Sequence, residues 1–304
     1  MSESNSDLQR KIVSATDLKS VVRTMKAMAA ANINQYENAV LSLDDYYRTV
    51  QLGLTAYFIN TDKSDYPTTD RISKSAAHKS QIGIIVIGSD QGLVGQFNDI
   101  LVNFLNEKRK DFAATQVILT AGERVRSLLE GEKALLGRHF SLPNSIDSIT
   151  SFVAEILLEV EELQTNKHLK EVYLFFNRTL DKPNYGPCYQ RILPFDHAWK
   201  HEFVSRPWPT RCLPQLLVEP ATTVSKLIRE YIFTSIFRGC IESLASENAS
   251  RLIAMQRAEK NIEELQEQMQ KSFNKLRQSA IDEELADLVN GFEALSSPEK
   301  IKTQ

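Results

Sequence analysis

Apolar residues recur every three or four positions from Thr222 to Leu295, and no proline interrupts them. This spacing places side chains along one face of an α-helix. At about 1.5 Å per residue the helix would be roughly 100 Å long, which is more than a domain of this size can cover. The helix therefore needs a companion helix, an enclosing partner, or both. Its apolar stripe consists of Leu252, Met255, Ala258, Ile262, Leu265, Met269, Phe273, Leu276 and Ala280.

A companion helix is predicted near the N-terminus, between Leu8 and Phe58, where the chain again lacks proline. Its apolar residues step almost strictly by threes and fours, and a repeat of about 3.5 residues is what a left-handed coiled coil requires. We therefore expect the first and last segments to pair as a long antiparallel coiled coil. This stripe consists of Leu8, Ile12, Ala15, Leu18, Val22, Met25, Ala29, Ile33, Tyr36, Val40, Leu43, Tyr47, Val50 and Leu54.

The middle of the chain has a different pattern. Residues 82–87 (IGIIVI) form an almost unbroken apolar run rich in β-branched residues, which is typical of a strand buried on both faces. Two more strands are predicted at 116–120 and 171–178. Because helices alternate with these strands, we expect right-handed crossovers and an open, mostly parallel sheet. The helices are expected after the turn at 88–98, around 124–129 and over 146–163.

Two segments without regular periodicity border this α/β region. Asn60–Lys79 is polar and contains a proline, so it should end the first helix and act as a linker. Asp181–Pro220 holds seven of the ten prolines, which predicts irregular structure with one more strand near Tyr189–Leu193. The predicted fold class is α/β, a long antiparallel coiled coil with an inserted Rossmann-like domain. Its expected parts are 1–60 (N-terminal coiled-coil helix), 61–80 (linker), 81–220 (inserted α/β domain) and 221–304 (C-terminal coiled-coil helix).

Composition narrows the possible functions. The 304 residues are 42% hydrophobic, which is enough for a real core, and the net charge of −3 argues against a nucleic-acid binder held by a general positive field. No apolar run approaches the roughly 18 residues that cross a bilayer, and the polar N-terminus does not resemble a secretory leader. Any attachment to a membrane should therefore pass through other proteins.

Basic residues gather on the first predicted helix, where they form either a solvated helix face or a surface for an acidic partner. The three cysteines, Cys188, Cys212 and Cys240, lie far apart without CxxC spacing, which indicates free thiols in a reducing compartment. The basic residues are Arg10, Lys11, Lys19, Arg23 and Lys26.

The main chemical candidate is the glycine-rich turn 88–95 (GSDQGLVG), directly after the first predicted strand. Such a turn can cradle a phosphate, but this one lacks the Lys-[Ser/Thr] ending of a P-loop and the GxGxxG spacing. A tight turn is the simple interpretation, and a surface for a partner is the functional one. The five histidines are scattered, and His197 with His201 lies in the proline-rich segment, where a helix is not expected. No motif here supports an enzyme assignment on its own, and we expect no cofactor or metal.

Three stretches resemble the gamma subunit of F-type ATP synthases. DLKSVVRTMKAMAAANINQYE is similar to the family's I-x-x-I-x-K-I-T-x-A-M-x-M-V-A-A-x-K, and GSDQGLVGQFN is similar to its S-D-R-G-L-C-G-x-x-N. The segment 246–295, SENASRLIAMQRAEKNIEEL and onward, resembles the family's S-E-x-x-x-R-M-x-A-M motif and its continuation through R-Q-x-x-I-T-x-E-L. With the strand LFFNR, the resemblance spans nearly the whole chain.

The resemblance implies a central rotor shaft that couples ion flow to ATP synthesis or hydrolysis on other chains. The implied partners are the catalytic and non-catalytic nucleotide-binding subunits of a hexameric ring, the epsilon subunit and the membrane rotor ring. The implied location is the cytoplasmic side of a bacterial inner membrane, as a peripheral part of the complex. A coiled-coil adaptor with an α/β head, or a small-molecule-binding domain on a stalk, remains the alternative.

The resemblance also implies partner contacts at six residues. Arg277 and Gln278 match an Arg-Gln pair that contacts loops of a catalytic subunit, and Met25 and Lys26 match positions near the bearing. The α/β domain, including Asp90 and Gly92, would face the foot of the shaft, the epsilon subunit and the membrane ring. These contact positions are Met25, Lys26, Asp90, Gly92, Arg277 and Gln278.

Several positions depart from the family's pattern. The family's loop Arg and Cys are Gln91 and Val94 here, an expected Lys is Asn32, and Asp282 and Glu283 precede Glu-Leu. These changes remove positive charge or add negative charge where a shaft would meet its partners. They motivate the hypothesis of an alternative, sodium-pumping F-type ATPase.

Overall fold

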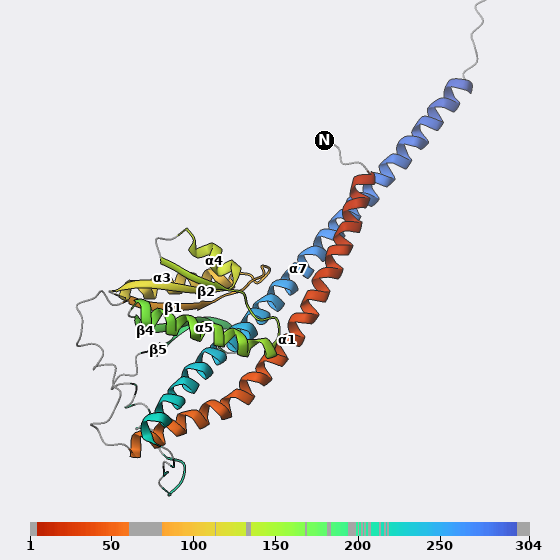
Figure 1. The fold of residues 1–304 in the computed structure, drawn as a ribbon. Helices are drawn as coiled ribbons and strands as arrows, with labels where there is room; N and C mark the ends of the chain where they lie inside the picture. The colour runs from red at the N-terminus through yellow and green to blue at the C-terminus, as the bar shows by residue number, and fades with distance from the viewer. Residues whose placement is uncertain are drawn as a thin grey trace, which may run out of the picture. The chain divides into compact units, whose positions relative to one another are not determined.

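The structure is a computed structural model (Figure 1). It describes residues 5–60, 81–112, 114–131, 135–167, 169–180 and 184–193, individual residues between 199 and 217, and residues 219–296. The predicted linker at 61–80 lies outside the described residues.

Both predicted terminal helices are present. Helix α1 spans Asn5–Asn60, and helix α7 spans Pro220–Ser296, where proline suits the first helical turn because its missing N–H would have no partner there. Their contacts confirm the antiparallel pairing. Thr16 accepts a hydrogen bond from Gln266, while further along α1 Asn32 bonds Asn248.

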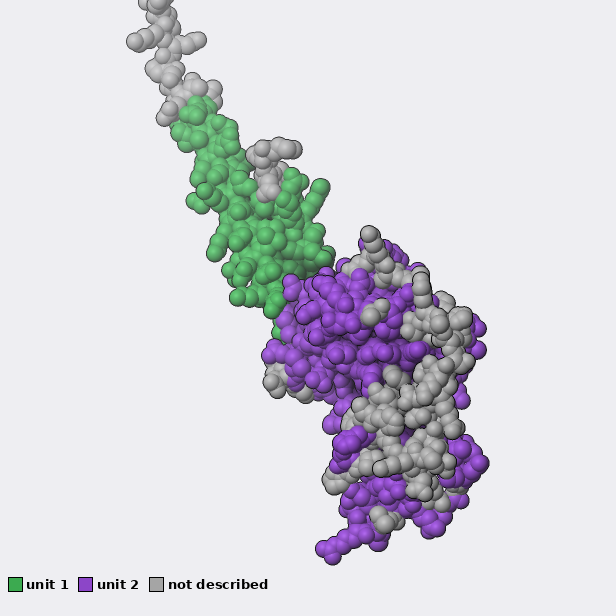
Figure 2. All heavy atoms as spheres, turned by 90° about the vertical axis from the view of Figure 1, so that its left-hand side faces the viewer, with its two compact units in different colours: residues 1–27, 255–304 green, residues 28–254 purple. Residues whose placement is uncertain are grey.

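The chain forms two compact units, coloured separately in Figure 2. The coiled-coil unit contains residues 1–27 and 255–304, and the α/β unit contains residues 28–254. The second half of α1 and the first part of α7 therefore belong to the α/β unit, where their side chains join its core.

The central sheet is mostly parallel, as predicted. Its strand order is β3-β2-β1-β4-β5, in which β5 alone of these five strands runs antiparallel to its neighbour. The apolar run 82–87 lies in β1 at the centre of the sheet, which explains why both of its faces are buried. The strands are β1 Gln81–Ile87, β2 Thr115–Ala121, β3 Leu135–Phe140, β4 Leu169–Thr179 and β5 Tyr185–Leu193.

Helices cover both faces of this sheet (Figure 1). Leu101 and Leu105 of α3 pack with Ile84 and other residues on one face, whereas α5 and the first part of α7 cover the other face. Full burial of each such aliphatic side chain contributes about 1.5–3 kcal/mol. The helices are α3 Phe97–Lys108, the 3₁₀ turn η1 Arg109–Asp111, α4 Glu123–Leu129 and α5 Ile146–Lys167.

Three sequence-based expectations need correction. Strand β3 was not predicted, because LLGRHF is short and is interrupted by glycine and two polar residues. Leu18, assigned to the α1 stripe, is 57% exposed, and Lys19 takes its place facing α7. The proline-rich segment contains a helical turn, in which the Ser205 N–H donates to the His201 carbonyl at 3.0 Å.

The cysteines behave as predicted: all three are free thiols. Cys240 is fully buried in the core, and burial raises the pKa of its thiol. Burial also raises the pKa of Cys188 to about 12, so this thiol stays protonated at neutral pH and is a poor nucleophile.

Candidate functional site: the coiled coil and the glycine loop

The coiled-coil unit has charged residues in its seam. From Leu8 the seam positions of α1 alternate in steps of four and three, and this register places Lys19 and Lys26 among apolar neighbours such as Ala15 and Val22. Leu8 and Ala15 are buried, whereas the lysine side chains stay 22% and 35% exposed. A lysine in a coiled-coil seam gives up apolar burial but specifies register when a partner meets its charge.

Two glutamates of α7 meet these charges. The Lys19 Nζ lies 3.0 Å from an oxygen of Glu263. The Arg23 Nε donates to Glu259 at 2.7 Å, and Lys26 donates to the other oxygen of the same carboxylate. The basic cluster predicted to be a solvated face or a partner surface is therefore largely paired inside the molecule.

Protonation of Glu259 would break this cluster. Hydrogen bonds from Lys26 and then Arg23 hold the pKa of Glu259 below its ordinary value. In return, the hydrogen bond to Glu259 raises the pKa of Arg23. The Glu259 carboxylate is therefore charged at neutral pH, and its ion pairs weaken only in acid.

The C-terminal part of α7 carries Arg277 and Gln278 on a surface without an intramolecular cover. Every described side chain from Asn274 to Phe292 is exposed. The exposed apolar residues of this segment recur at helical spacing and form a stripe, which we call the tip stripe. It consists of Leu276, Ile281, Leu285, Leu288, Val289 and Phe292.

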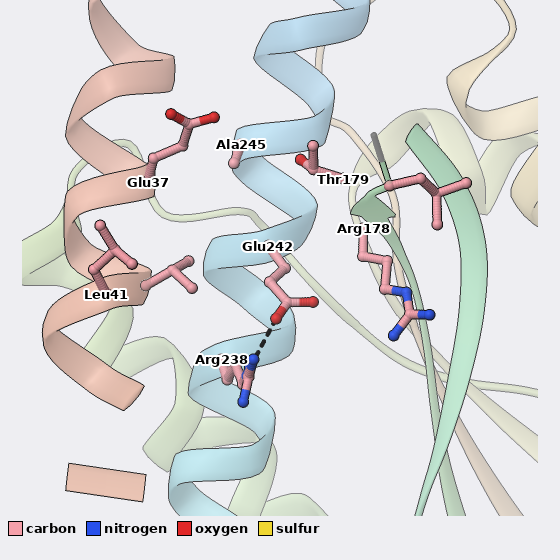
Figure 3. Close-up of a pocket in the computed structure, with 9 residues that line it drawn as sticks. Glu37, Leu41, Arg178, Thr179, Arg238, Glu242 and Ala245 are labelled. Atoms are coloured by element: carbon pink, nitrogen blue, oxygen red, sulfur yellow. Dashed lines mark hydrogen bonds and ion pairs between the residues drawn. The ribbon is translucent and has the colours of Figure 1, made fainter. Parts of the chain in front are cut away.

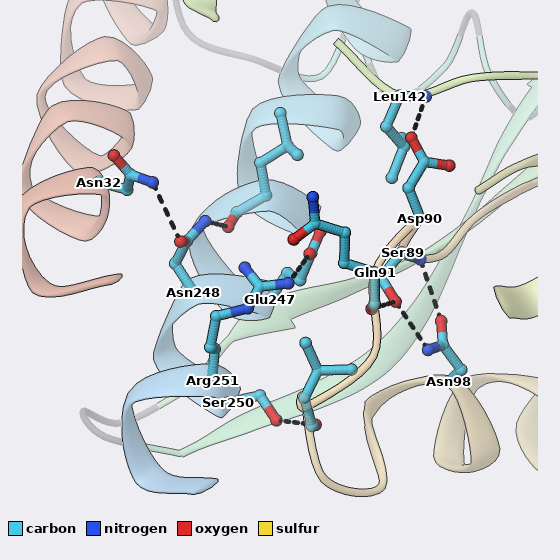
Figure 4. A network of polar contacts seen from close by, with 12 residues as sticks. Asn32, Ser89, Asp90, Gln91, Asn98, Leu142, Glu247, Asn248, Ser250 and Arg251 are labelled. Atoms are coloured by element: carbon cyan, nitrogen blue, oxygen red, sulfur yellow. Dashed lines mark hydrogen bonds and ion pairs between the residues drawn. The ribbon is translucent and has the colours of Figure 1, made fainter. Parts of the chain in front are cut away.

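The α/β unit presents the glycine loop, residues 88–95, at the end of β1 (Figure 4). The Asp90 carboxylate accepts the backbone N–H of Glu123 at 3.0 Å and that of Leu142 at 2.9 Å. Asp90 therefore ties the loop to the start of α4 and to the segment after β3. Its predicted role as a partner contact is untested, and its two oxygens already serve the fold.

Ser89, like Asp90, is fixed by hydrogen bonds to neighbouring segments. Its backbone N–H donates to Asn98 Oδ1 at 3.0 Å, and Asn98 Nδ2 donates to its hydroxyl oxygen at 2.8 Å. Gly122 makes this packing possible, because a Cβ there would lie 2.8 Å from the Ser89 backbone and its φ is +110°. With its hydroxyl bonded in turn to the Gln91 carbonyl, Ser89 serves the loop structure.

Helix α7 fixes the loop from the other side. The Ser243 hydroxyl donates to the Ile87 carbonyl at 3.1 Å, and the Ser250 hydroxyl donates to the Val94 carbonyl at 2.5 Å. On the same stretch of α7, buried Glu247 and partly buried Arg251 form an ion pair at 2.6 Å (Figure 4). Burial raises the pKa of Glu247, and Arg251 opposes that rise.

Sequence reasoning missed the role of this buried pair. Its signal was a glutamate and an arginine four residues apart within a stretch whose other positions are apolar or small. In the same network Asn32 Nδ2 donates to Asn248 Oδ1 at 3.3 Å, so the asparagine that replaces the family's lysine has an internal partner.

One open pocket of about 550 Å³ lies between α1, the end of β4 and α7 (Figure 3). Its charged lining includes Glu37, Arg178, Arg238 and Glu242. Arg238 is already engaged, since its Nε donates to Glu242 at 2.8 Å and its guanidinium lies 3.2 Å from Asp44. The lining contains two basic and two acidic side chains, so its net charge favours neither an anion nor a cation.

The six predicted contact residues are divided between the units. Met25, Lys26, Arg277 and Gln278 belong to the coiled-coil unit, and Asp90 and Gly92 belong to the α/β unit. Within the described residues, no group of three His, Cys, Asp or Glu side chains could hold a metal ion.

Known proteins share this chain's sequence pattern over nearly its full length. A family model described as ATP synthase matches residues 4–295. The ATP synthase gamma chain of Syntrophus aciditrophicus is 27% identical over 295 residues, covering 95% of this chain and 98% of the relative. The ATP synthase gamma chain of Xylella fastidiosa is 28% identical over 302 residues, covering 96% and 99%.

Solved structures share the fold. A chain of the Euglena gracilis mitochondrial ATP synthase rotor has a TM-score of 0.64 at 16% identity, with 91% of this chain and 98% of that chain covered. A chain from the OSCP/F1/c-ring assembly of the same enzyme has a TM-score of 0.68 at 16% identity, with 99% of both covered. The chain therefore belongs to the ATP synthase family, as a gamma subunit with the fold of the central stalk.

Proposed function

We propose that this chain is the central rotor shaft of an F-type ATP synthase and that it couples ion translocation to ATP synthesis or hydrolysis on other subunits. The tip stripe carries this proposal. A single helix with an exposed apolar stripe is marginal in water, so residues 274–292 need an enclosing partner. A ring of subunits around the tip supplies that cover while leaving the shaft free to turn.

The shaft acts mechanically, with the chemistry on its partners. A rotating element changes nucleotide affinity only if each face makes different contacts with the ring in turn. The antiparallel pair provides such asymmetry, because α1 and α7 present different side chains at every level. The side chains of the glycine loop that resemble catalytic groups, Ser89 and Asp90, are instead bonded to the loop's own surroundings.

The partners follow from the same proposal. The Euglena chain of similar fold was solved with F1 and the c-ring. For this chain we propose catalytic and non-catalytic nucleotide-binding subunits around the coiled coil, with an epsilon subunit and a membrane rotor ring at the α/β unit. The location is then peripheral, on the cytoplasmic side of a bacterial inner membrane. None of the described helices combines the length and apolar character of a bilayer span.

The residues predicted to contact partner subunits differ in how available their side chains are. Arg277 and Gln278 are exposed on α7 beside the tip stripe, where they are available to loops of a catalytic subunit. Met25 is partly buried on α1, and the exposed part of its side chain is available to a partner subunit. Lys26 contributes less than the resemblance implies, because Glu259 already neutralises its charge.

Reconstitution tests the proposed function. Co-expression with the two nucleotide-binding subunits should produce one complex with six of those subunits per copy of this chain, and that complex should hydrolyse ATP. The chain alone should not hydrolyse ATP. A stable homodimer that ignores the ring subunits would support the adaptor alternative, and nucleotide bound to the isolated chain would support the small-molecule one.

We further propose that the complex moves sodium ions, a hypothesis motivated by Gln91, Asn32, Asp282 and Glu283. Sodium should then stimulate ATP hydrolysis by the purified membrane-bound complex at constant ionic strength. Equal rates in sodium and potassium would remove the sodium hypothesis while leaving the shaft intact.

A further inference from the structure

The open pocket between α1, the end of β4 and α7 has a volume of about 550 Å³, which lies within the range of small-molecule sites, about 300–1,000 Å³ (Figure 3). All nine residues that line it, from Glu37 to Ala245, belong to the α/β unit. The pocket is therefore formed within one compact unit of the chain, and the contacts of its lining indicate what it can bind.

The pocket presents apolar side chains from both α1 and the end of β4. Leu41 of α1 is 67% exposed, and Leu180, directly after β4, is 55% exposed. The Leu180 N–H donates to the Asn184 carbonyl at 2.9 Å, which fixes this leucine at the connection between β4 and β5. Val40 and Ala245 line the pocket as well. Single exposed leucines are ordinary, but two that come from different elements to line one pocket provide a surface for an alkyl chain.

Arg238 supplies one of the two positive charges of the lining, and this charge is already matched. Its Nε donates to Glu242 at 2.8 Å, and its guanidinium lies 3.2 Å from Asp44 and over the ring of Tyr47. Asp44 is on α1 and Glu242 is on α7. Arg238 therefore connects the helices that form the pocket, and two carboxylates neutralise its charge.

Arg178 supplies the other positive charge. Its side chain is exposed, and among the residues that the structure describes no carboxylate pairs with it. Burial raises the pKa of the nearby Cys188 thiol to about 12 and Arg178 opposes that rise, so this thiol stays protonated at neutral pH and supplies no negative charge. Glu37, on α1, lies on the opposite side of the pocket (Figure 3). The Arg178 guanidinium is therefore available to an anion that enters the pocket.

We propose that this pocket binds an amphipathic carboxylate, with the carboxylate on the Arg178 guanidinium and the alkyl chain against Leu41 and Leu180. The planar guanidinium presents two parallel N–H groups, which match the two oxygens of a carboxylate. The lining is neutral overall, so the pairing of its charges, and not their sum, selects an anion. This inference does not depend on the proposed function, because it uses contacts within the α/β unit alone.

Octanoate labelled with ¹³C at its carboxyl carbon is the probe, titrated into the full chain and followed by the shift of the carboxyl resonance. Octanoate should bind at least about tenfold more tightly than acetate, because its chain buries several methylene groups. Octylammonium, which has a similar chain and the opposite charge, should not compete with it. Failure of octanoate to bind, or competition by octylammonium at equal concentration, would overturn the inference.

Arg178→Gln tests the charged half of the site. It should weaken octanoate binding about tenfold through the loss of charge-assisted hydrogen bonds. Because Arg178 is exposed, the melting temperature of the chain should stay unchanged. Arg48→Gln is the matched control, because Arg48 is exposed on α1 outside the pocket and should change neither measurement. Equal affinity of the two variants for octanoate would contradict the proposed role of Arg178.

Leu41→Ser tests the apolar half with the guanidinium in place. The affinity for octanoate should decrease severalfold while the affinity for acetate stays the same, a result that a loss of folding would not produce. The reconstituted complex with the nucleotide-binding subunits should bind octanoate with the affinity of the isolated chain. If the complex loses this binding, a partner subunit covers the pocket and the ligand site is excluded.

Discussion

The two units of this chain complete their folding in different ways. The α/β unit buries apolar side chains on both faces of its sheet, and it pairs the buried Glu247 carboxylate with Arg251. The coiled-coil unit buries only one narrow seam, and α7 then continues with its tip stripe in solvent. The α/β unit therefore covers the apolar residues of its core within its own fold, whereas the coiled-coil unit leaves apolar residues that a partner must cover.

The ion pairs of the two units also differ in how far they are exposed to solvent. The ion pairs of the coiled coil are partly solvated, whereas Glu247 is 6% exposed and depends on Arg251 for its charge. Exposed pairs contribute little stability but can select register, whereas a buried charge becomes very unfavourable once its partner is removed. Substitutions in the α/β unit should therefore lower the free energy of unfolding. Substitutions in the coiled-coil unit should mainly weaken binding to partner subunits.

The largest expected effect on folding is at Gly122. Gly122→Ala would place a Cβ against the Ser89 backbone at a positive φ, so we expect a loss of about 3 kcal/mol of unfolding free energy. Gly131→Ala is the control, because nothing lies within 4 Å of the position that its new Cβ would occupy. Urea denaturation measures both, and equal stability of the two variants would contradict the described packing of the loop.

A smaller loss is expected when the buried pair is broken. Arg251→Ala leaves the Glu247 carboxylate without its cation and should cost about 2 kcal/mol at neutral pH. Because burial raises the pKa of Glu247, the folded variant should bind a proton more readily than the unfolded chain, so its stability should recover as pH falls towards 5. Denaturation at several pH values checks this sign, and a further loss in mild acid would contradict it.

Substitutions in the tip stripe should affect partner binding rather than stability. Leu288→Asp, at a residue 71% exposed, should change the unfolding free energy by no more than about 0.5 kcal/mol and should weaken ring binding about tenfold or more. Hydrogen exchange should show rapid exchange of residues 274–292 in the isolated chain and protection in the complex. A fully protected, monodisperse isolated monomer would show that this segment needs no partner.

The smallest expected effect is a loss of helix content after substitutions in the seam of the coiled coil. Glu259→Lys opposes Arg23 and Lys26, so helix content near the N-terminus should decrease, and Lys26→Glu in the same chain should restore part of it. Since the pKa of Glu259 is lowered, its contribution is present above the ordinary value of 4.5 and is lost as pH falls through the lower folded value. Circular dichroism between pH 7 and pH 3 measures this, and an acid response unchanged in Glu259→Gln would exclude Glu259 as its source.

Elements with a local repeat of apolar residues could be predicted from the sequence alone. Steps of three and four residues specified α1 and α7, and the run 82–87 specified the central strand, because each pattern depends on neighbours within a few turns or residues. The remaining contacts depend on how distant segments pack together. Lys26 meets Glu259 only because segments more than 230 residues apart in the sequence pair in the fold. Both oxygens of Asp90 reach backbone N–H groups only because the start of α4 and the segment after β3 pack against the glycine loop. These contacts depend on distances across the fold, which no local pattern in the chain encodes.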